Sequence, residues 1–284
     1  MGIFDGCLLA CDIDGTLLYD EILPERNIEK IKDFVREGGK FSLSTGRTSL
    51  ALKDITSKID CISPSVLSNG CVIYDFKAKK CITEKLLPRK TLFMVNRVIE
   101  SVKIGVELHT ADSVLVPSSS PASELHERYE SMVPRYVSAS EAVNRDINKV
   151  IYFLENEEQT KTVSGISKDY ENECVFYKTS AFIGGVKQNY FEQIPKGVSK
   201  ASALNELLGI LKIRNGGFFA IGDYYNDVEM IKAADIGAVP LESPEDIKAQ
   251  AEVVTGSVKD GAVADFIEYL EGIFKNGQAN KTKF

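Results

Sequence analysis

The sequence predicts an α/β fold in which a parallel sheet, with helices on both faces, carries an inserted α+β module. Strand-like apolar runs alternate with amphipathic helical segments up to about residue 83, and the same alternation resumes after about residue 190. Residues 84–190 instead contain neighbouring strand-like runs that are typical of an antiparallel sheet. We therefore expect one domain formed by residues 1–83 and 191–284, and a second domain formed by residues 84–190.

The first part of the chain has the order β-α-β-α-β. Residues 7–11 form an apolar run typical of a buried strand, and apolar residues then recur at helical spacing between residues 28 and 35. The segment "KFSLSTGR" (40–47) predicts a second strand that runs into a turn, and a further helical face follows it. "SVLSNGCVIYD" (65–75) contains an Asn-Gly pair between two apolar runs, which indicates a hairpin.

The middle segment predicts a helix over residues 90–104 and a hairpin over 106–116. "PSSSPAS" (117–123) has two prolines among small polar residues, and we interpret it as a loop. After a further strand and helix, residues 174–194 contain two or three strands, broken at Gly184-Gly185.

The last part of the chain returns to the parallel pattern. Residues 196–211 predict a helix, and "GFFAIGD" (217–223) predicts a strand that ends in a carboxylate. A helix begins near Val228, and apolar residues at helical spacing between 263 and 274 indicate a final amphipathic helix.

Composition narrows the possible partners. Acidic residues outnumber basic ones by 41 to 34, a net charge of −7, which disfavours nucleic acid and anionic membranes as partners. The six cysteines match no zinc or disulfide pattern, and the N-terminal segment lacks the features of a signal peptide. We expect reduced thiols, a cytoplasmic location, a small-molecule ligand, and a monomer or small homo-oligomer. With only two histidines, a histidine-based mechanism is disfavoured.

Three predicted strands end in residue types that bind phosphate or metal. The first strand ends at Asp12, the second at Thr45-Gly46-Arg47, and a later one at Gly222-Asp223. In an open parallel sheet, ligands bind beyond the carboxyl ends of the strands, so these groups can meet at one edge.

Each of these motifs also has a simpler interpretation. "DIDG" can be a turn, although it is not an EF-hand, because the required glutamate position is Leu23. "TGR" can be a turn, and Lys200 alone reads as a solvated helix lysine. "GDYYND" (222–227) can be a capped helix start or a metal site.

Taken in order, "DIDGTL", "STGR", the lysine of "KGVSK" and "GDYYND" resemble the signature of the haloacid dehalogenase (HAD) superfamily. The hairpin "SNGCVIYD", the place of the inserted module and "FEQIPKGVSKASAL" resemble its Cof-type phosphatase branch. The resemblance implies a Rossmann-like core with an inserted α+β cap domain that sets substrate choice.

The resemblance also implies phosphoryl transfer through an aspartyl-phosphate. Asp12 would be the nucleophile, and Asp14 would be the general acid and base. Phosphoryl oxygens would be bound by Thr45, Gly46, Arg47 and Lys200. Mg²⁺ would be the cofactor, held by Asp12, Asp14 through its backbone carbonyl, Asp223, Asn226 and Asp227.

One loop departs from the branch pattern. "GAVPLESP" (237–244) carries Leu241-Glu242-Ser243 where relatives usually have Gly-Asn-Ala. A glutamate there either disfavours acidic substrates or faces solvent. The resulting prediction is a Mg²⁺-dependent phosphatase for a small phosphate ester, such as a sugar phosphate or a phosphorylated cofactor. A phosphomutase and a non-catalytic sugar-phosphate sensor are the alternatives, whereas a dehalogenase does not need the second aspartate or a metal.

Overall fold

The computed structural model describes residues 2–130, 132–183 and 185–281, which divide into two compact units. The first unit contains the chain up to Gly46, Lys53–Ile82 and the chain from Ser199, and the second contains Arg47–Leu52 and Thr83–Val198. This division lies beyond the expected boundary at residue 190, because the last strand of the second unit runs on to Pro195. The short segment 47–52 packs with the second unit although both of its flanking segments belong to the first.

The first unit is built on a five-stranded parallel sheet, which confirms the predicted α/β class. In spatial order its strands are β14 (Val253–Val254), β13 (Ile236–Val239), β12 (Phe218–Ile221), β1 (Leu8–Cys11) and β2 (Lys40–Leu43). A single parallel bridge between Ser44 and Val66 adds β3 beside β2. A smaller sheet contains β3 (Ser65–Leu67), β4 (Val72–Asp75) and β5 (Lys80–Glu84), and this stretch of the first unit ends within β5, at Ile82.

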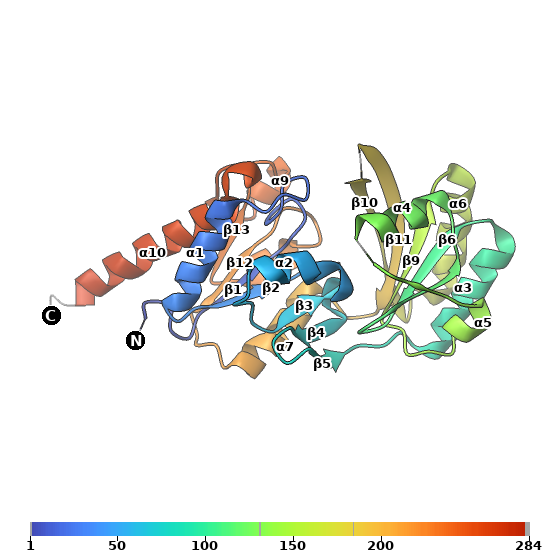
Figure 1. Ribbon diagram of the computed structural model, residues 1–284, viewed down its shortest axis with the longest axis horizontal. Helices are drawn as coiled ribbons and strands as arrows, with labels where there is room; N and C mark the ends of the chain where they lie inside the picture. The colour runs from blue at the N-terminus through green and yellow to red at the C-terminus, as the bar shows by residue number, and fades with distance from the viewer. Residues whose placement is uncertain (1, 131, 184, 282–284) are drawn as a thin grey trace. The chain divides into compact units, whose positions relative to one another are not determined.

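Helices cover both faces of the parallel sheet because side chains alternate along each strand. Phe218 and Ala220 of β12 join an apolar cluster with side chains of α7 (Lys200–Leu211) and α8 (Val228–Ala233), whereas Phe219 contacts Phe274 of α10 (Ala262–Lys281). Helix α1 runs beside α10 (Figure 1). The helices of this unit are α1 (Glu25–Arg36), α2 (Lys53–Lys58), α7 (Lys200–Leu211), α8 (Val228–Ala233), α9 (Glu245–Lys248) and α10 (Ala262–Lys281), with the 3-10 turns η2 (Ser68–Gly70) and η4 (Val258–Asp260).

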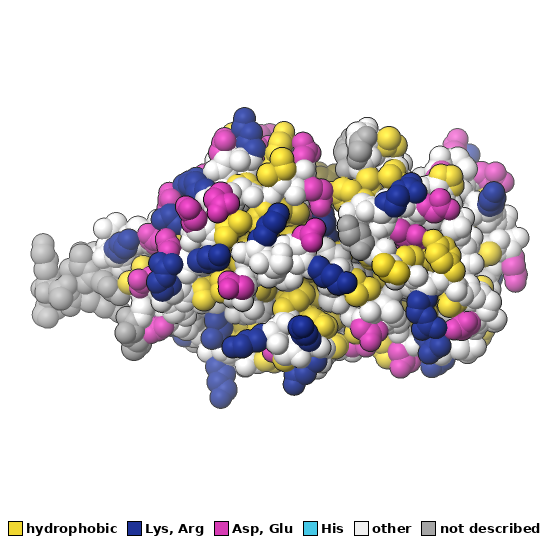
Figure 2. Space-filling view, in the orientation of Figure 1, with side chains coloured by type: hydrophobic (Ala, Val, Ile, Leu, Met, Phe, Trp, Pro, Cys, Tyr) yellow, Lys and Arg dark blue, Asp and Glu magenta, His cyan; other side chains and the backbone are white. Residues whose placement is uncertain are grey.

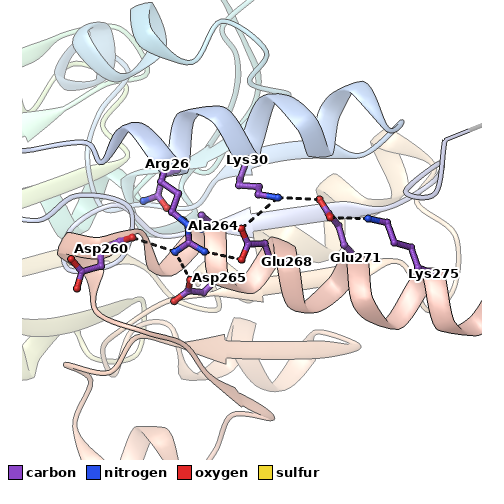
Figure 3. A network of polar contacts seen from close by, with 9 residues as sticks. Arg26, Lys30, Asp260, Ala264, Asp265, Glu268, Glu271 and Lys275 are labelled. Atoms are coloured by element: carbon purple, nitrogen blue, oxygen red, sulfur yellow. Dashed lines mark hydrogen bonds and ion pairs between the residues drawn. The ribbon is translucent and has the colours of Figure 1, made fainter.

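A line of ion pairs joins α1 to α10 on the solvent side (Figure 3). Arg26 pairs with Asp265 and with Glu268, whose carboxylate lies 2.8 Å from the guanidinium. Lys30 reaches Glu268 at 3.4 Å and Glu271 at 3.7 Å. Because these side chains are partly exposed, the network contributes little to stability for its size and is weakened by salt.

The second unit contains a six-stranded sheet that is antiparallel except for one pair, β7 with β8. Its strands, in spatial order, are β10 (Cys174–Ile183), β11 (Val186–Pro195), β9 (Lys149–Leu154), β6 (Gly105–His109), β7 (Val114–Ser118) and β8 (Arg135–Tyr136). Its helices are α3 (Arg89–Ser101), α4 (Pro121–Tyr129), α5 (Ala139–Ala142) and α6 (Glu157–Ser167), with the 3-10 turns η1 (Leu50–Leu52) and η3 (Lys168–Tyr170).

The two faces of this second sheet differ in chemistry. One face carries the large apolar core, in which Leu108, Tyr152 and Phe191 pack against residues of α3 and α6. On the opposite face Ile151, Phe153 and Tyr190 form a smaller cluster with Ala122 of α4. The predicted strands of the middle segment are therefore present, and β10 and β11 form one long hairpin. Of the Gly184-Gly185 break, Gly184 lies outside the described residues.

The interpretation of "PSSSPAS" as a loop is wrong. β7 extends through Pro117 to Ser118, and α4 begins at Pro121. Ser120 caps this helix, since its hydroxyl accepts from the Ser123 backbone N–H while the Ser123 hydroxyl accepts from the Ser120 N–H. Proline fits the first turn of a helix and serine fits the cap, so the residue types that suggested a loop instead begin a helix.

A buried cluster of charged side chains lies on the α4 face of the second sheet. Glu107 is fully buried, and its carboxylate accepts from His109 Nε2 at 3.1 Å and from His126 Nδ1 at 3.2 Å. On its other side, His126 Nε2 lies 3.4 Å from an oxygen of Glu130. Both histidines of the chain therefore bind one carboxylate.

The charged groups in this cluster stabilise one another. Burial alone would raise the pKa of Glu107, but His126 and His109 lower it to about 2. Burial opposes protonation of His126, but its carboxylate neighbours outweigh this and raise its pKa to about 10. Burial lowers the pKa of His109, so this ring stays neutral. Nearby, Lys149 Nζ lies 3.5 Å from Glu192, which adds a second ion pair.

One face of the molecule carries charged side chains of both signs (Figure 2). Figure 2 shows Lys and Arg side chains interspersed with Asp and Glu over the face in view, as expected for a net charge of only −7. Within the described ranges, no helix combines the length and the apolar character needed to cross a membrane.

Candidate active site

The parallel sheet of the first unit brings the ends of two polar-tipped strands together. β1 and β12 pair in parallel and in register, Cys11 beside Ile221. Asp12 follows the first strand directly, and Gly222-Asp223 follows the second. β2 pairs with β1 on its other side, so Thr45 and Gly46 follow a strand that ends at the same edge. The three strands thus share one sheet, which is the condition under which the sequence motifs were expected to meet at one edge.

Three carboxylates converge at this edge. Oxygen atoms of Asp12, Asp223 and Asp227 all lie within 4.8 Å of one another. Asp12 is 5% exposed and Asp227 is fully buried, whereas Asp223 is partly exposed. Carboxylates that are this close together and largely buried repel one another strongly. A nearby positive charge is therefore needed to stabilise them.

Lys200 supplies part of that compensation. Its Nζ lies 2.6 Å from Asp12 Oδ1 and 2.6 Å from Asp227 Oδ1, and the residue is only 2% exposed. Lys200 is the first residue of α7, where the Ser199 and Ser202 side chains form a capping box. The cap fixes the start of the helix and hence the point from which the ammonium group reaches the acidic cluster.

Asp227 also organises the loop that carries Asp223. Its Oδ2 accepts from the backbone N–H groups of Asp223 at 3.2 Å and Tyr224 at 3.3 Å. The hydroxyl of Thr16, a residue of the "DIDGT" motif to which the sequence analysis gave no role, donates to Asp223 Oδ1 at 3.4 Å. Asp227 is therefore a structural element of the site as well as a candidate ligand.

The site carries an excess of negative charge. Burial, and then Asp227, raise the pKa of Asp12 to about 7 despite the neighbouring ammonium of Lys200. Burial and the charges of Asp12 and Asp227 likewise raise the pKa of Asp223. Burial disfavours the charged form of Lys200, but the two carboxylates outweigh it and its pKa is raised. One lysine does not neutralise these carboxylates.

The remaining predicted site residues differ in their surroundings. Asp14 is exposed, and its charge adds to the raised pKa values of Asp12 and Asp223. Asn226 is exposed in the loop between Asp223 and Asp227. Thr45 is buried, and its backbone N–H donates to Val66 O at 3.0 Å.

Arg47 belongs with the second unit. Its guanidinium carbon lies 5.6 Å from the centre of the Tyr129 ring, a cation–π contact, and the residue is 6% exposed. The next residue, Thr48, donates its hydroxyl to the sulfur of Met132 at 3.8 Å, also within the second unit. The predicted phosphate-binding run Thr45-Gly46-Arg47 is thus divided between the two units after Gly46.

The acidic cluster suits a hard divalent cation. Its donors are all carboxylate oxygens, the ligand type that Mg²⁺ and Ca²⁺ prefer, and they are close enough to share one ion. The excess charge around Asp12 gives a physical reason for a cation there. The donor set and the electrostatics therefore both fit the metal site that the sequence suggested.

The unusual Glu242 has a local role. Its carboxylate accepts from the Ser257 hydroxyl and, at 3.1 Å, from the backbone N–H of Val258. These bonds lower the pKa of Glu242 although its partial burial acts in the opposite direction. Glu242 thus holds the start of η4, and this contact accounts for a glutamate at the position.

Comparison with known proteins gives consistent matches. Residues 9–267 match the family model described as haloacid dehalogenase-like hydrolase. The chain is 24% identical over 288 residues to the 5-amino-6-(5-phospho-D-ribitylamino)uracil phosphatase YwtE of Bacillus subtilis, which covers 92% of this chain and 97% of the relative. Among solved structures, a sugar phosphatase of HAD subclass IIB superposes with a TM-score of 0.78 at 20% identity, over 93% of this chain and 99% of that one.

A longer plant protein also matches. The chain is 28% identical over 277 residues to the chloroplastic endoribonuclease YBEY of Arabidopsis thaliana, which covers 91% of this chain but 45% of that protein. The chain therefore spans less than half of this relative, whose name describes the longer protein.

Proposed function

Because the chain belongs to the haloacid dehalogenase superfamily, in its Cof-type phosphatase branch, we propose that it hydrolyses a small phosphate monoester through an aspartyl-phosphate, with Mg²⁺ as cofactor. The observation that carries the proposal is the buried convergence of Asp12, Asp223, Asp227 and Lys200 at the carboxyl edge of β1 and β12. These three carboxylates outnumber the lysine that pairs with two of them, and a divalent cation would compensate the excess charge.

In this proposal Asp12 is the nucleophile. Its carboxylate attacks phosphorus, the bond from phosphorus to the ester oxygen breaks, and a mixed anhydride forms that water then hydrolyses. Lys200 Nζ, 2.6 Å from Asp12 Oδ1, leaves Oδ2 as the attacking atom and limits rotation of the carboxylate. The contact supports a preorganised nucleophile, which is worth several orders of magnitude in rate.

Asp14 is exposed, whereas Asp12 is buried, and exposure suits a proton-transfer role. It lies two residues after Asp12 and is exposed, so it is accessible to water and to a leaving group. We assign it protonation of the departing ester oxygen and then removal of a proton from the attacking water.

The cation and the phosphoryl group would use the rest of the set. Asp12, Asp223 and Asp227 would hold Mg²⁺ with the Asp14 carbonyl and Asn226, and the bound ion would neutralise carboxylate and phosphoryl charge. The Thr45 hydroxyl, the Gly46 N–H, Arg47 and Lys200 would bind phosphoryl oxygens and stabilise negative charge in the transition state.

The names of two relatives support the substrate class. One relative is named a phosphatase of a phosphorylated ribitylamino-uracil, and one solved structure is named a sugar phosphatase. We therefore propose that the substrate is a sugar phosphate, a phosphorylated cofactor or a precursor of such a cofactor, and that the protein acts on it in the cytoplasm. We assign recognition of this substrate to residues of the second unit.

Phosphate release from a panel of such esters, with Mg²⁺ or with EDTA, tests the proposal. We expect turnover in Mg²⁺ but not in EDTA. The amount of free phosphate formed should equal the amount of alcohol released. Phosphate migration within the substrate, stimulated by a bisphosphate, would instead identify a phosphomutase. Tight binding of a sugar phosphate without any turnover would identify a sensor.

A further inference from the structure

The turn Ser68–Asn69–Gly70, between β3 and β4, has an unusual backbone. All three residues have positive φ, 50°, 57° and 102°, so two residues with side chains occupy the left-handed region. Ser68 and Asn69 are also buried, at 1% and 8% exposure. Such conformations are costly outside glycine and persist where surrounding structure enforces them, often at functional sites.

Asn69 holds the Thr45–Gly46 turn in two ways. Its backbone N–H donates to Thr45 O at 3.0 Å. Its carboxamide lies against Gly46, because a Cβ built on Gly46 would be 3.1 Å from Asn69 Oδ1 and 3.3 Å from Nδ2. The Thr45 N–H also donates to Val66 O. Both backbone polar groups of Thr45 are therefore hydrogen-bonded to the segment from β3 to Asn69.

Gly70 makes the second contact of the turn, with the start of α7. A Cβ at Gly70 would overlap the carbonyl oxygen of Ser199 and lie 3.2 Å from the backbone nitrogen of Lys200. Ser199 caps the helix whose first residue is Lys200. A side chain at position 70 would not fit this approach, and the left-handed backbone of Ser68 and Asn69 leads Gly70 to it.

We propose that Asn69 is a positioning residue of the phosphoryl site, and that the Ser68–Gly70 turn sets the spacing between the Thr45–Gly46 turn and Lys200. This inference rests on the proposed function, in which Thr45, Gly46 and Lys200 bind the phosphoryl group. The Asn69 carboxamide fills the space beside the Cα of Gly46 and so restricts movement of the Thr45–Gly46 turn, and Gly70 packs against the start of α7. Donors must be placed to within fractions of an ångström, because a misplacement of about 1 Å can cost about a hundredfold in rate.

Asn69→Gly tests the role of the Asn69 side chain while the backbone conformation of the turn is kept. Glycine adopts positive φ without strain, so the turn is kept while the carboxamide is removed. Lys79→Gly is the matched control, since Lys79 also has positive φ, at 51°, but is exposed in the turn between β4 and β5. The assay is hydrolysis of p-nitrophenyl phosphate with Mg²⁺, together with inhibition by inorganic phosphate and with melting curves.

We expect Asn69→Gly to lower kcat/KM and to weaken phosphate inhibition, each by about tenfold, which is less than the roughly hundredfold cost of a misplacement of about 1 Å. Its Tm should fall no further than that of Lys79→Gly, whose kinetics should match the wild type. An Asn69→Gly protein whose phosphate inhibition constant and kcat/KM stay within about twofold of the wild type would overturn the inference, whatever its Tm.

A double-mutant cycle tests the contact itself. Gly46→Ala should be more harmful in the wild type, where the methyl group meets the Asn69 carboxamide, than in Asn69→Gly. Additive effects would show that Asn69 does not act through Gly46.

Thermal stabilisation by inorganic phosphate, in the wild type and in Asn69→Gly, provides a readout that does not depend on turnover. A smaller shift in the variant supports the inference, and equal shifts overturn it. Failure of the wild type to hydrolyse any ester would count against the proposed function alone.

Discussion

Asp12 in the first unit and Glu107 in the second are both almost completely buried carboxylates, yet their pKa values move in opposite directions. Burial and the neighbouring Asp227 raise the pKa of Asp12 to about 7. At Glu107 burial acts in the same direction, but His126 and His109 overcome it and lower the pKa to about 2. Equal burial thus gives opposite results because the neighbouring charges differ.

The difference separates the proposed catalytic centre from a structural one. Around Glu107 several cations accompany the buried carboxylates. His126 lies between Glu107 and Glu130, and Lys149 pairs with Glu192. Arg47 and Lys149 also lower the pKa of Glu130. Around Asp12, one ammonium group faces several carboxylates. A centre with uncompensated charge is unfavourable by itself, and such sites are typical of places that bind an ion or a ligand.

Asp12→Asn is the strongest test of the proposed catalytic centre. The amide has the same shape but cannot attack phosphorus, so we expect kcat to fall by at least about a thousandfold. The fold should remain, because the change removes one of several mutually repelling charges. Steady-state kinetics with p-nitrophenyl phosphate, and a melting curve, measure both. A variant with more than about a thousandth of the wild-type kcat would show that Asp12 is not the nucleophile.

Asp227→Ala and Asp223→Asn separate the structural role of Asp227 from metal binding by Asp223. Asp227 pairs with Lys200 and accepts two backbone N–H bonds, so we expect its loss to cost about 3–5 kcal/mol in EDTA. Asp223 has no comparable clamp, so Asp223→Asn should melt no lower than the wild type in EDTA.

The response to Mg²⁺ provides the control for this pair. At about 100 times its Kd, Mg²⁺ should stabilise the wild type by about 2.7 kcal/mol, and this gain should largely disappear in Asp223→Asn. If Asp223→Asn melts well below the wild type in EDTA and still gains the full Mg²⁺ shift, Asp223 is not a metal ligand.

The structural centre should respond to pH rather than to metal. The folded-state pKa of His126 is about 10, above the unfolded value of about 6.5, so its contribution is complete below pH 6.5 and is lost as the pH rises towards 10. Glu107 acts in the other direction, and its contribution is lost only as the pH falls from about 4.5 towards 2. The lowered pKa of His109 reduces stability below about pH 6.5.

We therefore expect the Tm of the wild type to fall between pH 7 and 10, by about 2–4 °C for each kcal/mol lost. His126→Gln should be less stable at pH 7 and should show a flatter profile over the same range. Melting curves in EDTA at a series of pH values measure this, and parallel profiles for the two proteins would contradict the assigned charge of His126.

The smallest effect among these predictions is expected for the ion pairs between α1 and α10. Arg26 is 40% exposed, so Arg26→Ala should cost less than about 1 kcal/mol and the cost should shrink at high salt. Neither kinetics nor the Mg²⁺ shift should change. Urea unfolding at low and high NaCl measures the effect, and a salt-independent loss of several kcal/mol would show that the arginine stem, rather than its charge, packs the two helices.

The sequence by itself determined the class of fold and the residues from which the candidate site is built. Apolar runs that end in Asp12 and in Gly222-Asp223 predict strands with polar tips, and the rule for parallel sheets places those tips at one edge. The family resemblance rested on the same short motifs and is confirmed. These predictions succeed because periodicity and turn chemistry act over a few neighbouring residues.

Tertiary structure decided which residues meet. Lys200 alone reads as a solvated helix lysine, yet packing of α7 buries it against Asp12, which is 188 positions away. The pairing of both histidines with Glu107 was hidden because α4, which carries His126, begins in a segment whose prolines and serines suggested a loop. Asn69 carries a turn signal in the sequence, but its contact with Gly46 exists only because β2 and β3 lie side by side. Contacts between distant residues depend on how whole elements pack, and local residue patterns do not encode that packing.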